Sequence, residues 1–136
     1  PWVHELLLVY PDKLINYRTV LVDKKWGIGK VPLLFRYDRE LVESGMKNRG
    51  ISLESAPAHF QADEKIVRLA VVQNGMALQY ASDELRNNSK IVNLAIEQNP
   101  QAIKYIGDTL LQDERFLKKL KRKYPEIEPY LGSLDN

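Results

Sequence analysis

The sequence predicts an all-α protein made of short helical hairpins that stack side by side. Three observations predict it: cap residues that recur every 25 positions, apolar residues at helical spacing after each cap, and turn residues after each apolar stretch. The two clearest copies run from Asp63 to Ala81 and from Asn88 to Ile106. One such unit cannot bury its apolar stripe alone, so the copies have to stack.

Each copy begins with a residue that favours the start of a helix. Asp and Asn are common there because the side-chain oxygen accepts a hydrogen bond from a backbone N–H that has no partner inside the helix. The period gives four such residues: Asp38, Asp63, Asn88 and Asp113. We therefore expect helices to start near residues 38, 63, 88 and 113, in a repeat domain over residues 38–131.

Two apolar pairs follow each of the first three caps, the first pair three positions after the cap and the second pair four positions further on, whereas the second pair after Asp113 is Leu120 and Lys121. This spacing sets the side chains on one stripe of a helix. The second pair begins with a small residue in three copies (Gly45, Ala70 and Ala95), which lets a neighbouring helix approach closely. The first pairs are Leu41/Val42, Ile66/Val67, Ile91/Val92 and Phe116/Leu117.

Turn residues end each first helix. Asn-Gly is a strong turn signal, and Pro suits the first position of a new helix. We expect a second, shorter helix after each turn, containing for example Leu78 or Ile103, and then a loop. The turn pairs are Arg49-Gly50, Asn74-Gly75, Asn99-Pro100 and Tyr124-Pro125.

Residues 1–37 do not follow the period, and we expect an N-terminal helical segment with an irregular loop there. Val3–Tyr10 is expected to be a helix, and Arg18–Asp23 the end of a helix rather than a strand. We interpret Tyr10-Pro11 as an echo of Tyr124-Pro125, as if the chain opened inside a degenerate repeat. Pro1 in place of Met suggests a trimmed chain or a fragment of a longer protein.

The segment Lys24–Lys30 is expected to be a surface loop with Trp26 anchored on the core. Its two glycines suggest a phosphate site, but the G-x-x-x-x-G-K-[ST] pattern is absent because Val31 follows Lys30. Pro32–Tyr37 is expected to be a short helix or an extended segment that packs on the first repeat. Residues 132–136 are expected to be a frayed tail.

The composition indicates a soluble single domain with no catalytic centre of its own. No apolar run approaches the ~18 residues of a membrane span. Cysteine is absent and there are only two histidines, His4 and His59, so we expect no metal, no cofactor and no enzymatic activity. A chain without cysteine fits the cytoplasm, although export without a cleavable signal fits equally well.

Two sets of residues are candidates for binding a partner. Tyr80 and Tyr105 share one repeat position and, with Trp26, form either an aromatic contact surface or ordinary packing between repeats. The last repeat carries six basic residues that either bind nucleic acid or another anionic surface, or simply face water. They are Arg115, Lys118, Lys119, Lys121, Arg122 and Lys123.

The pattern D-x-x-I-V-x-x-A-V-x-x-N-G-x-A-L-x-Y-A, which starts at Asp63, resembles the domain of unknown function numbered 4116. The resemblance is close over residues 63–106 and looser over residues 38–62 and 113–131. It implies a helical fold in several copies and brings no catalytic residue with it.

The function that we expect from the sequence is that of a protein-interaction module: an adaptor, regulator or inhibitor of a partner protein. Stacked helical repeats offer extended binding surfaces, and the sequence lacks a catalytic set. Two alternatives stay open: binding of nucleic acid or an anionic surface through the basic C-terminal helix, or a non-catalytic part of a longer enzyme. The partner and the oligomeric state do not follow from the sequence.

Overall fold

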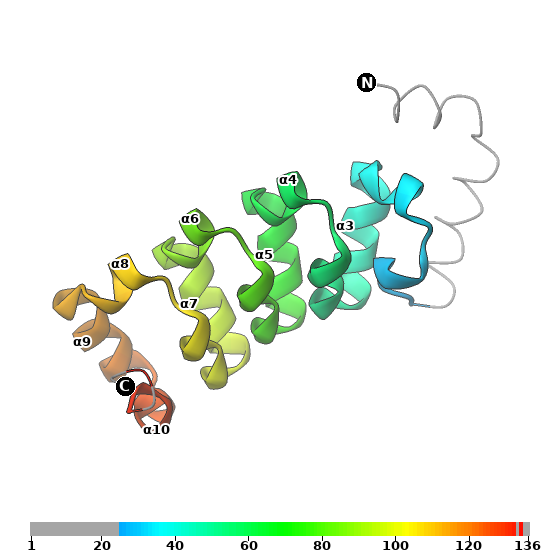
Figure 1. Ribbon diagram of the computed structural model, residues 1–136. Helices are drawn as coiled ribbons and strands as arrows, with labels where there is room; N and C mark the ends of the chain where they lie inside the picture. The colour runs from blue at the N-terminus through cyan, green and yellow to red at the C-terminus, as the bar shows by residue number, and fades with distance from the viewer. Residues whose placement is uncertain (1–24, 133, 135–136) are drawn as a thin grey trace.

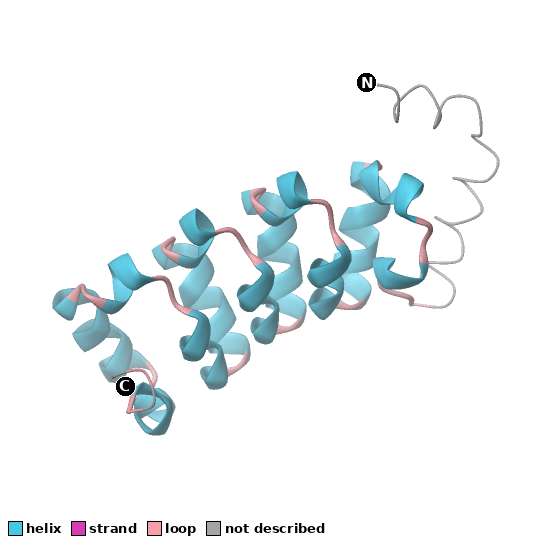
Figure 2. Ribbon diagram, in the orientation of Figure 1, coloured by secondary structure: helices cyan, strands magenta, loops and turns pink. Residues whose placement is uncertain are grey.

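The computed structural model describes residues 25–132 and residue 134, and within them every regular element is a helix (Figure 2). The expectations for Val3–Tyr10, Tyr10-Pro11 and Arg18–Asp23 lie outside the described residues. The elements, with η for 3₁₀-helices, are η1 (Ile28–Lys30), η2 (Leu33–Tyr37), α3 (Arg39–Asn48), η3 (Gly50–Ser55), α4 (Ala58–Gln61), α5 (Glu64–Gln73), η4 (Gly75–Tyr80), α6 (Asp83–Arg86), α7 (Ser89–Gln98), η5 (Pro100–Tyr105), α8 (Asp108–Leu111), α9 (Glu114–Lys123), η6 (Pro125–Ile127) and α10 (Glu128–Leu131).

The repeats stack side by side, as predicted, and their helices form two layers. The long helices α3, α5 and α7 lie side by side in one layer, and the 3₁₀-helices η3, η4 and η5 follow one another in the other (Figure 1). The one-turn helices α4, α6 and α8 line one edge of the stack (Figure 1). Each repeat thus adds the same three elements, and the core lies between the layers.

All four predicted caps are confirmed. Each cap side chain accepts a hydrogen bond from the backbone N–H three residues further on, at 3.1 Å for Asp38 and Asp63, 3.3 Å for Asn88 and 3.0 Å for Asp113. Each of the four long helices that follow has ten residues. The cap therefore fixes where each repeat starts.

The predicted apolar stripes form the core in the first three repeats. In α5, for example, Ile66, Val67 and Ala70 are fully buried. In α9 the equivalent Phe116 and Leu117 are only half-buried. The fourth copy therefore buries less of its apolar stripe than the first three copies do.

The predicted second helix is present in each repeat, as a 3₁₀-helix in the first three copies and as η6 followed by α10 in the fourth. The segment after it, predicted to be a loop, contains a one-turn α-helix, which in the second copy is α6 with the buried Leu85. A 3₁₀-helix has three residues per turn, so residues three apart share a face. Leu78 and Ala81 are such a pair, and both are buried.

The periodic packing extends further toward the N-terminus than the sequence pattern indicated. Ile28, Val31 and Phe35 are buried at positions 25 residues before the buried Leu53, Ala56 and Phe60. Residues 28–37 form η1 and η2, which correspond to the second half of a repeat, so the predicted irregular loop is shorter than expected. At the other end, Leu134 packs on the core rather than fraying.

At the first two junctions, adjacent repeats meet through a glycine. A methyl group on Gly50 or Gly75 would overlap the backbone carbonyl of Ala70 or Ala95 in the next repeat. The same glycine N–H groups donate to a glutamine of that repeat, Gly50 to Gln73 at 2.6 Å and Gly75 to Gln98. The predicted close approach at the small residues is therefore present, and the approaching element is the start of the preceding 3₁₀-helix.

Candidate interaction surfaces

Three tyrosines occupy one repeat position on the layer of short helices. Tyr80 ends η4, Tyr105 ends η5 and Tyr130 lies in α10; all three are half-buried and pack against the core. Because η4 contacts η5 and η5 contacts α10, the three rings follow one another along the stack. We call Tyr80, Tyr105 and Tyr130 the tyrosine row. Sequence reasoning selected the first two and missed Tyr130, although it lies 25 residues after Tyr105.

Charged side chains flank the tyrosine row with opposite sign at its two ends. At one end, partial burial and the nearby Glu54 carboxylate raise the pKa of Tyr80 above its ordinary value. At the other end, Lys104 Nζ lies 5.3 Å from the centre of the Tyr130 ring. Between them, Gln79 is uncharged and its amide donates to the Met76 carbonyl at 3.0 Å. Glu54 and Lys104 thus place opposite charges beside Tyr80 and Tyr130, the two ends of the row.

A cavity of about 380 Å³ continues this surface toward the N-terminus. Trp26, which is half-buried as expected, lines it together with Lys30, Arg49 and Glu54. Lys30 Nζ lies 4.9 Å from the centre of the Trp26 ring. Glu54 borders both this cavity and Tyr80, so all three aromatic candidates from the sequence lie on one side of the stack. We call this side, from Trp26 to Tyr130, the tyrosine face.

The six basic candidates lie on α9, in the layer of long helices. All of them are exposed, and none forms an ion pair with another described residue. Asp113 caps this helix and Glu114 is its first residue, so most of the cationic side chains lie toward its C-terminal end, where the helix dipole favours them. The basic and aromatic candidates thus form two separate surfaces.

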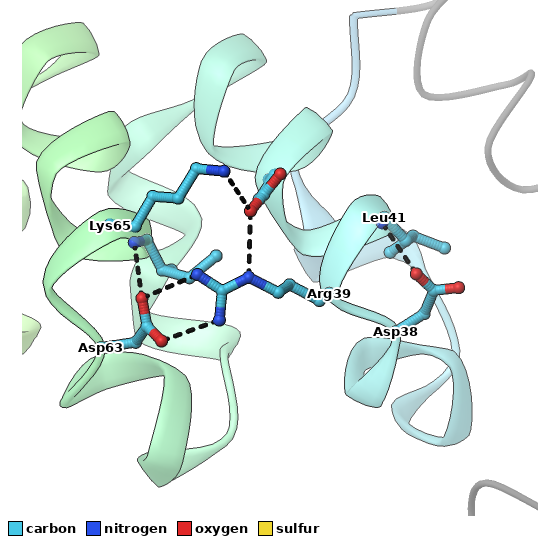
Figure 3. A network of polar contacts seen from close by, with 7 residues as sticks. Asp38, Arg39, Leu41, Asp63 and Lys65 are labelled. Atoms are coloured by element: carbon cyan, nitrogen blue, oxygen red, sulfur yellow. Dashed lines mark hydrogen bonds and ion pairs between the residues drawn. The ribbon is translucent and has the colours of Figure 1, made fainter.

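The long-helix layer carries a network of ion pairs between the first two repeats (Figure 3). Arg39 of α3 donates to both carboxylate oxygens of Asp63, at 2.8 and 3.1 Å, and to Glu43 at 3.1 Å. Lys65 Nζ lies 3.4 Å from Glu43 Oε1. The Arg39 hydrogen bond, helped by the backbone N–H of Ile66, lowers the pKa of Asp63. This network joins repeats and has no open position for a ligand.

The one histidine among residues 25–132 lies on the surface of the stack. His59 is exposed and stacks on Tyr37, with 5.8 Å between ring centres. No three His, Cys, Asp or Glu residues of the described chain gather as metal ligands would. Within the same residues, each helix is too short or too polar to cross a bilayer.

Comparison with known proteins agrees with this repeat architecture. The chain matches no curated protein and no solved structure. One family model matches twice, over residues 38–86 and residues 63–111. Both matches begin at a cap residue and span two adjacent repeats, and together they cover more than half of the chain. The protein therefore belongs to the family described as Domain of unknown function (DUF4116).

Proposed function

We propose that this protein is a protein-interaction module that binds an extended segment of a partner protein along the tyrosine face. The observation that carries the proposal is the tyrosine row: one amphipathic side chain at the same position of three successive repeats, half-exposed on one surface. Tyrosine contributes a large apolar ring and a hydrogen-bonding hydroxyl at low entropic cost, which suits it to binding surfaces.

The dimensions of the row suit an extended polypeptide. Packed helices lie about 8–10 Å apart, so the three tyrosines span about 16–20 Å. An extended chain advances about 3.3 Å per residue, so about five or six residues reach from one end of the row to the other. The Glu54 and Lys104 side chains favour one direction of binding, with a basic group of the partner near Glu54 and an acidic group near Lys104.

The proposal includes no catalytic activity, and we infer a reducing compartment such as the cytoplasm. The support is compositional: the chain has no cysteine nucleophile and two histidines, and several of its acidic residues serve as helix caps or in first turns. The proposed partner is therefore bound rather than converted, and a regulator, adaptor or inhibitor fits this description.

Site-directed photo-crosslinking in native lysate tests the proposal. A photo-reactive amino acid replaces Gln79, between Tyr80 and Tyr105, and in a matched protein it replaces Lys65 on the opposite layer. We expect the Gln79 protein to crosslink to one partner whose crosslinked peptide is identified by mass spectrometry. The crosslink should survive nuclease and disappear in Glu54→Arg/Lys104→Glu, since both side chains are exposed and their reversal leaves the core intact.

The control for a general loss of tyrosine is Tyr37→Ala. Tyr37 is 42% exposed and lies on η2, outside the tyrosine face. Its replacement should leave the crosslink unchanged, whereas Tyr80→Ala/Tyr105→Ala should remove it. A crosslink at Lys65 and none at Gln79 would assign the partner to the other layer and refute the proposal.

The exposed basic side chains of α9 favour a second candidate function, the binding of nucleic acid. This contact should weaken steeply with salt, because each neutralised phosphate releases a counterion. The measurement is the affinity for a fluorescent single-stranded oligonucleotide at two salt concentrations. Undetectable or salt-independent binding at low salt excludes this function.

A further inference from the structure

The junction between the third and fourth repeats is built differently from the earlier ones. The extensive contacts that α5 makes with α3 and α7 are not repeated between α7 and α9. At the position of Ala70 and Ala95, the fourth repeat has the larger Leu120. At the position of Gly50 and Gly75, the third repeat has Pro100, which has no N–H to donate.

The glutamine of the earlier junctions is replaced as well. Lys123 stands where Gln73 and Gln98 accept the glycine N–H, and an ammonium group accepts no hydrogen bond. The junction therefore lacks both the glycine N–H donor and the glutamine acceptor. In addition, Leu120 is larger than the alanine of the earlier junctions and keeps α7 and α9 apart. The result is a cleft of about 300 Å³ between α7 and α9.

The walls of this cleft combine an apolar floor with a cationic rim. Its six lining residues are Ser89 and Asn93 from α7 and Phe116, Lys119, Leu120 and Lys123 from α9. Leu120 is 2% exposed and Phe116 is half-buried, so the floor is apolar but reachable at the aromatic ring. Lys119 and Lys123 lie one helical turn apart, on the same side of α9, and both are exposed.

We propose that the cleft between α7 and α9 binds an acidic segment of a partner protein that carries a large apolar side chain. The apolar side chain contacts the Phe116 ring above the buried Leu120, and neighbouring carboxylates of the segment pair with Lys119 and Lys123. The Asn93 side chain lines the cleft and donates to the Ser89 carbonyl at 2.8 Å, which leaves its amide oxygen as the group that can accept a backbone N–H of the segment. The inference rests on the proposed function for the kind of occupant and adds a second, separate contact to it.

The apolar floor favours a polypeptide over nucleic acid as the occupant. A phosphate backbone binds to cationic side chains and does not require the apolar floor. It can therefore bind the exposed Lys118 and Arg122 as well as it binds Lys119 and Lys123. A segment held by an apolar anchor instead depends on the two lysines that border the cleft. The two occupants therefore respond differently to charge reversal at these two pairs.

The test starts from peptides selected on the full chain from a random phage-displayed library, using Tyr80→Ala/Tyr105→Ala as bait so that the tyrosine face does not contribute. We expect a consensus of acidic residues beside an aromatic or large aliphatic one. In fluorescence anisotropy, Lys119→Glu/Lys123→Glu should weaken binding of the selected peptide at least about tenfold, since like charges then face each other. Asn93→Trp, which fills the cleft without changing the charge, should weaken it similarly.

The matched control is Lys118→Glu/Arg122→Glu, which changes the net charge equally with the same spacing on the same helix but outside the cleft. It should weaken peptide binding less than about threefold at physiological salt, where exposed charges are screened. Equal losses for both pairs, or a selection without the acidic and apolar consensus, overturn the cleft. These variants should leave the crosslink at Gln79 unchanged. The proposal for the cleft and the proposal for the tyrosine face can therefore be refuted independently.

Discussion

The first three repeats pack closely on one another, whereas the third and fourth repeats pack loosely, although all four have the same fold. Where Gly75 meets Ala95 and Gln98, two repeats approach to backbone contact and bury their stripes fully. Where Pro100 precedes Leu120, the long helices stand apart and half-expose an aromatic ring. The comparison teaches that the repeat itself does not determine how tightly copies pack. The match between a turn residue of one copy and a helix residue of the next determines it.

The largest difference between the tightly packed repeats and α9 should be the loss of unfolding free energy when an apolar side chain is truncated. Leu78→Ala or Ile91→Ala leaves a cavity at a fully buried site and should cost about 2–4 kcal/mol of unfolding free energy. Leu117→Ala, in the half-buried stripe of α9, should cost less than about 1.5 kcal/mol, because less apolar surface is buried there. Urea denaturation measures all three. Losses under about 0.5 kcal/mol for Leu78→Ala and Ile91→Ala rule out the repeat core.

The glycine contact gives the next largest effect. Gly75→Ala drives a methyl group into the Ala95 carbonyl, and the resulting backbone shift should cost about 1–3 kcal/mol. Gly132→Ala is the control, since no atom lies within 4 Å of its added methyl and its φ of −60° suits alanine. The control should change stability by less than about 0.5 kcal/mol. Equal effects of the two substitutions on the thermal midpoint contradict the close approach.

Gln98 and Lys123 occupy the same repeat position at the two types of junction, and exchanging them should affect stability differently. Gln98→Lys introduces the residue of the last junction and leaves the Gly75 N–H without its acceptor, at a cost of about 1–2 kcal/mol. Lys123→Gln makes the reverse exchange and should change stability by less than about 0.5 kcal/mol, because Pro100 has no N–H to offer. The unfolding free energies of the two variants give the comparison, and a larger loss for Lys123→Gln contradicts it.

The smallest effect concerns the ion pairs of the first junction and depends on pH. Arg39 lowers the pKa of Asp63, so the pair stabilises the fold fully above the ordinary carboxyl pKa of about 4. The contribution is lost as pH falls through the lowered pKa of the folded state, because the unfolded chain takes up the proton first. Arg39 is 44% exposed, so solvent screening keeps the contribution below about 1 kcal/mol.

Arg39→Ala should therefore reduce stability at neutral pH, and this loss should shrink on acidification as pH falls through the lowered pKa of Asp63 in the folded state. The measurement is the unfolding free energy from neutral to acidic pH, with Asp63→Asn as a second variant that removes the titrating group. An Arg39→Ala loss that is the same at both ends of the pH range shows that Arg39 acts by packing alone.

The sequence predicts the first helix of every repeat because both of its signals are local. A cap such as Asn88 and a stripe such as Ile91, Val92 and Ala95 act within one helix and are visible without the neighbouring chain. Whether the second helix is an α-helix or a 3₁₀-helix is harder to predict from the sequence. Leu78 and Ala81 are three apart, a spacing that both an α-helix and a 3₁₀-helix place on one face.

The periodic packing of η1 and η2 was missed although its signal is present. Pro32 and Phe35 stand 25 residues before Pro57 and Phe60. The cap that opens the repeats, however, has no equivalent there, since the corresponding position is Lys13. Because the cap residues mark the repeats in the sequence, the first recognisable repeat starts at Asp38. The half-repeat before it has no such cap residue and is not recognised from the sequence.

Of the candidate surfaces, the sequence predicts the row of tyrosines better than the cleft. Tyr80 and Tyr105 share a position that one period reveals, and the same period extends to Tyr130. The cleft instead arises from Pro100 in one repeat acting with Leu120 and Lys123 in the next. Each of these residues is unremarkable within its own copy, and only their juxtaposition separates the helices.

The glycine at each tight junction has a consequence for how such a chain can lengthen. A tandem duplication of residues 63–87 joins Gly75 to a new Ala70 and Gln73, so the added copy docks as the original does. A duplication of residues 88–112 joins Pro100 to a new Gln98, whose side-chain oxygen then has no donor to meet. Copying should therefore reproduce the tight glycine junction in the middle of the array and a junction without that hydrogen bond near its C-terminal end.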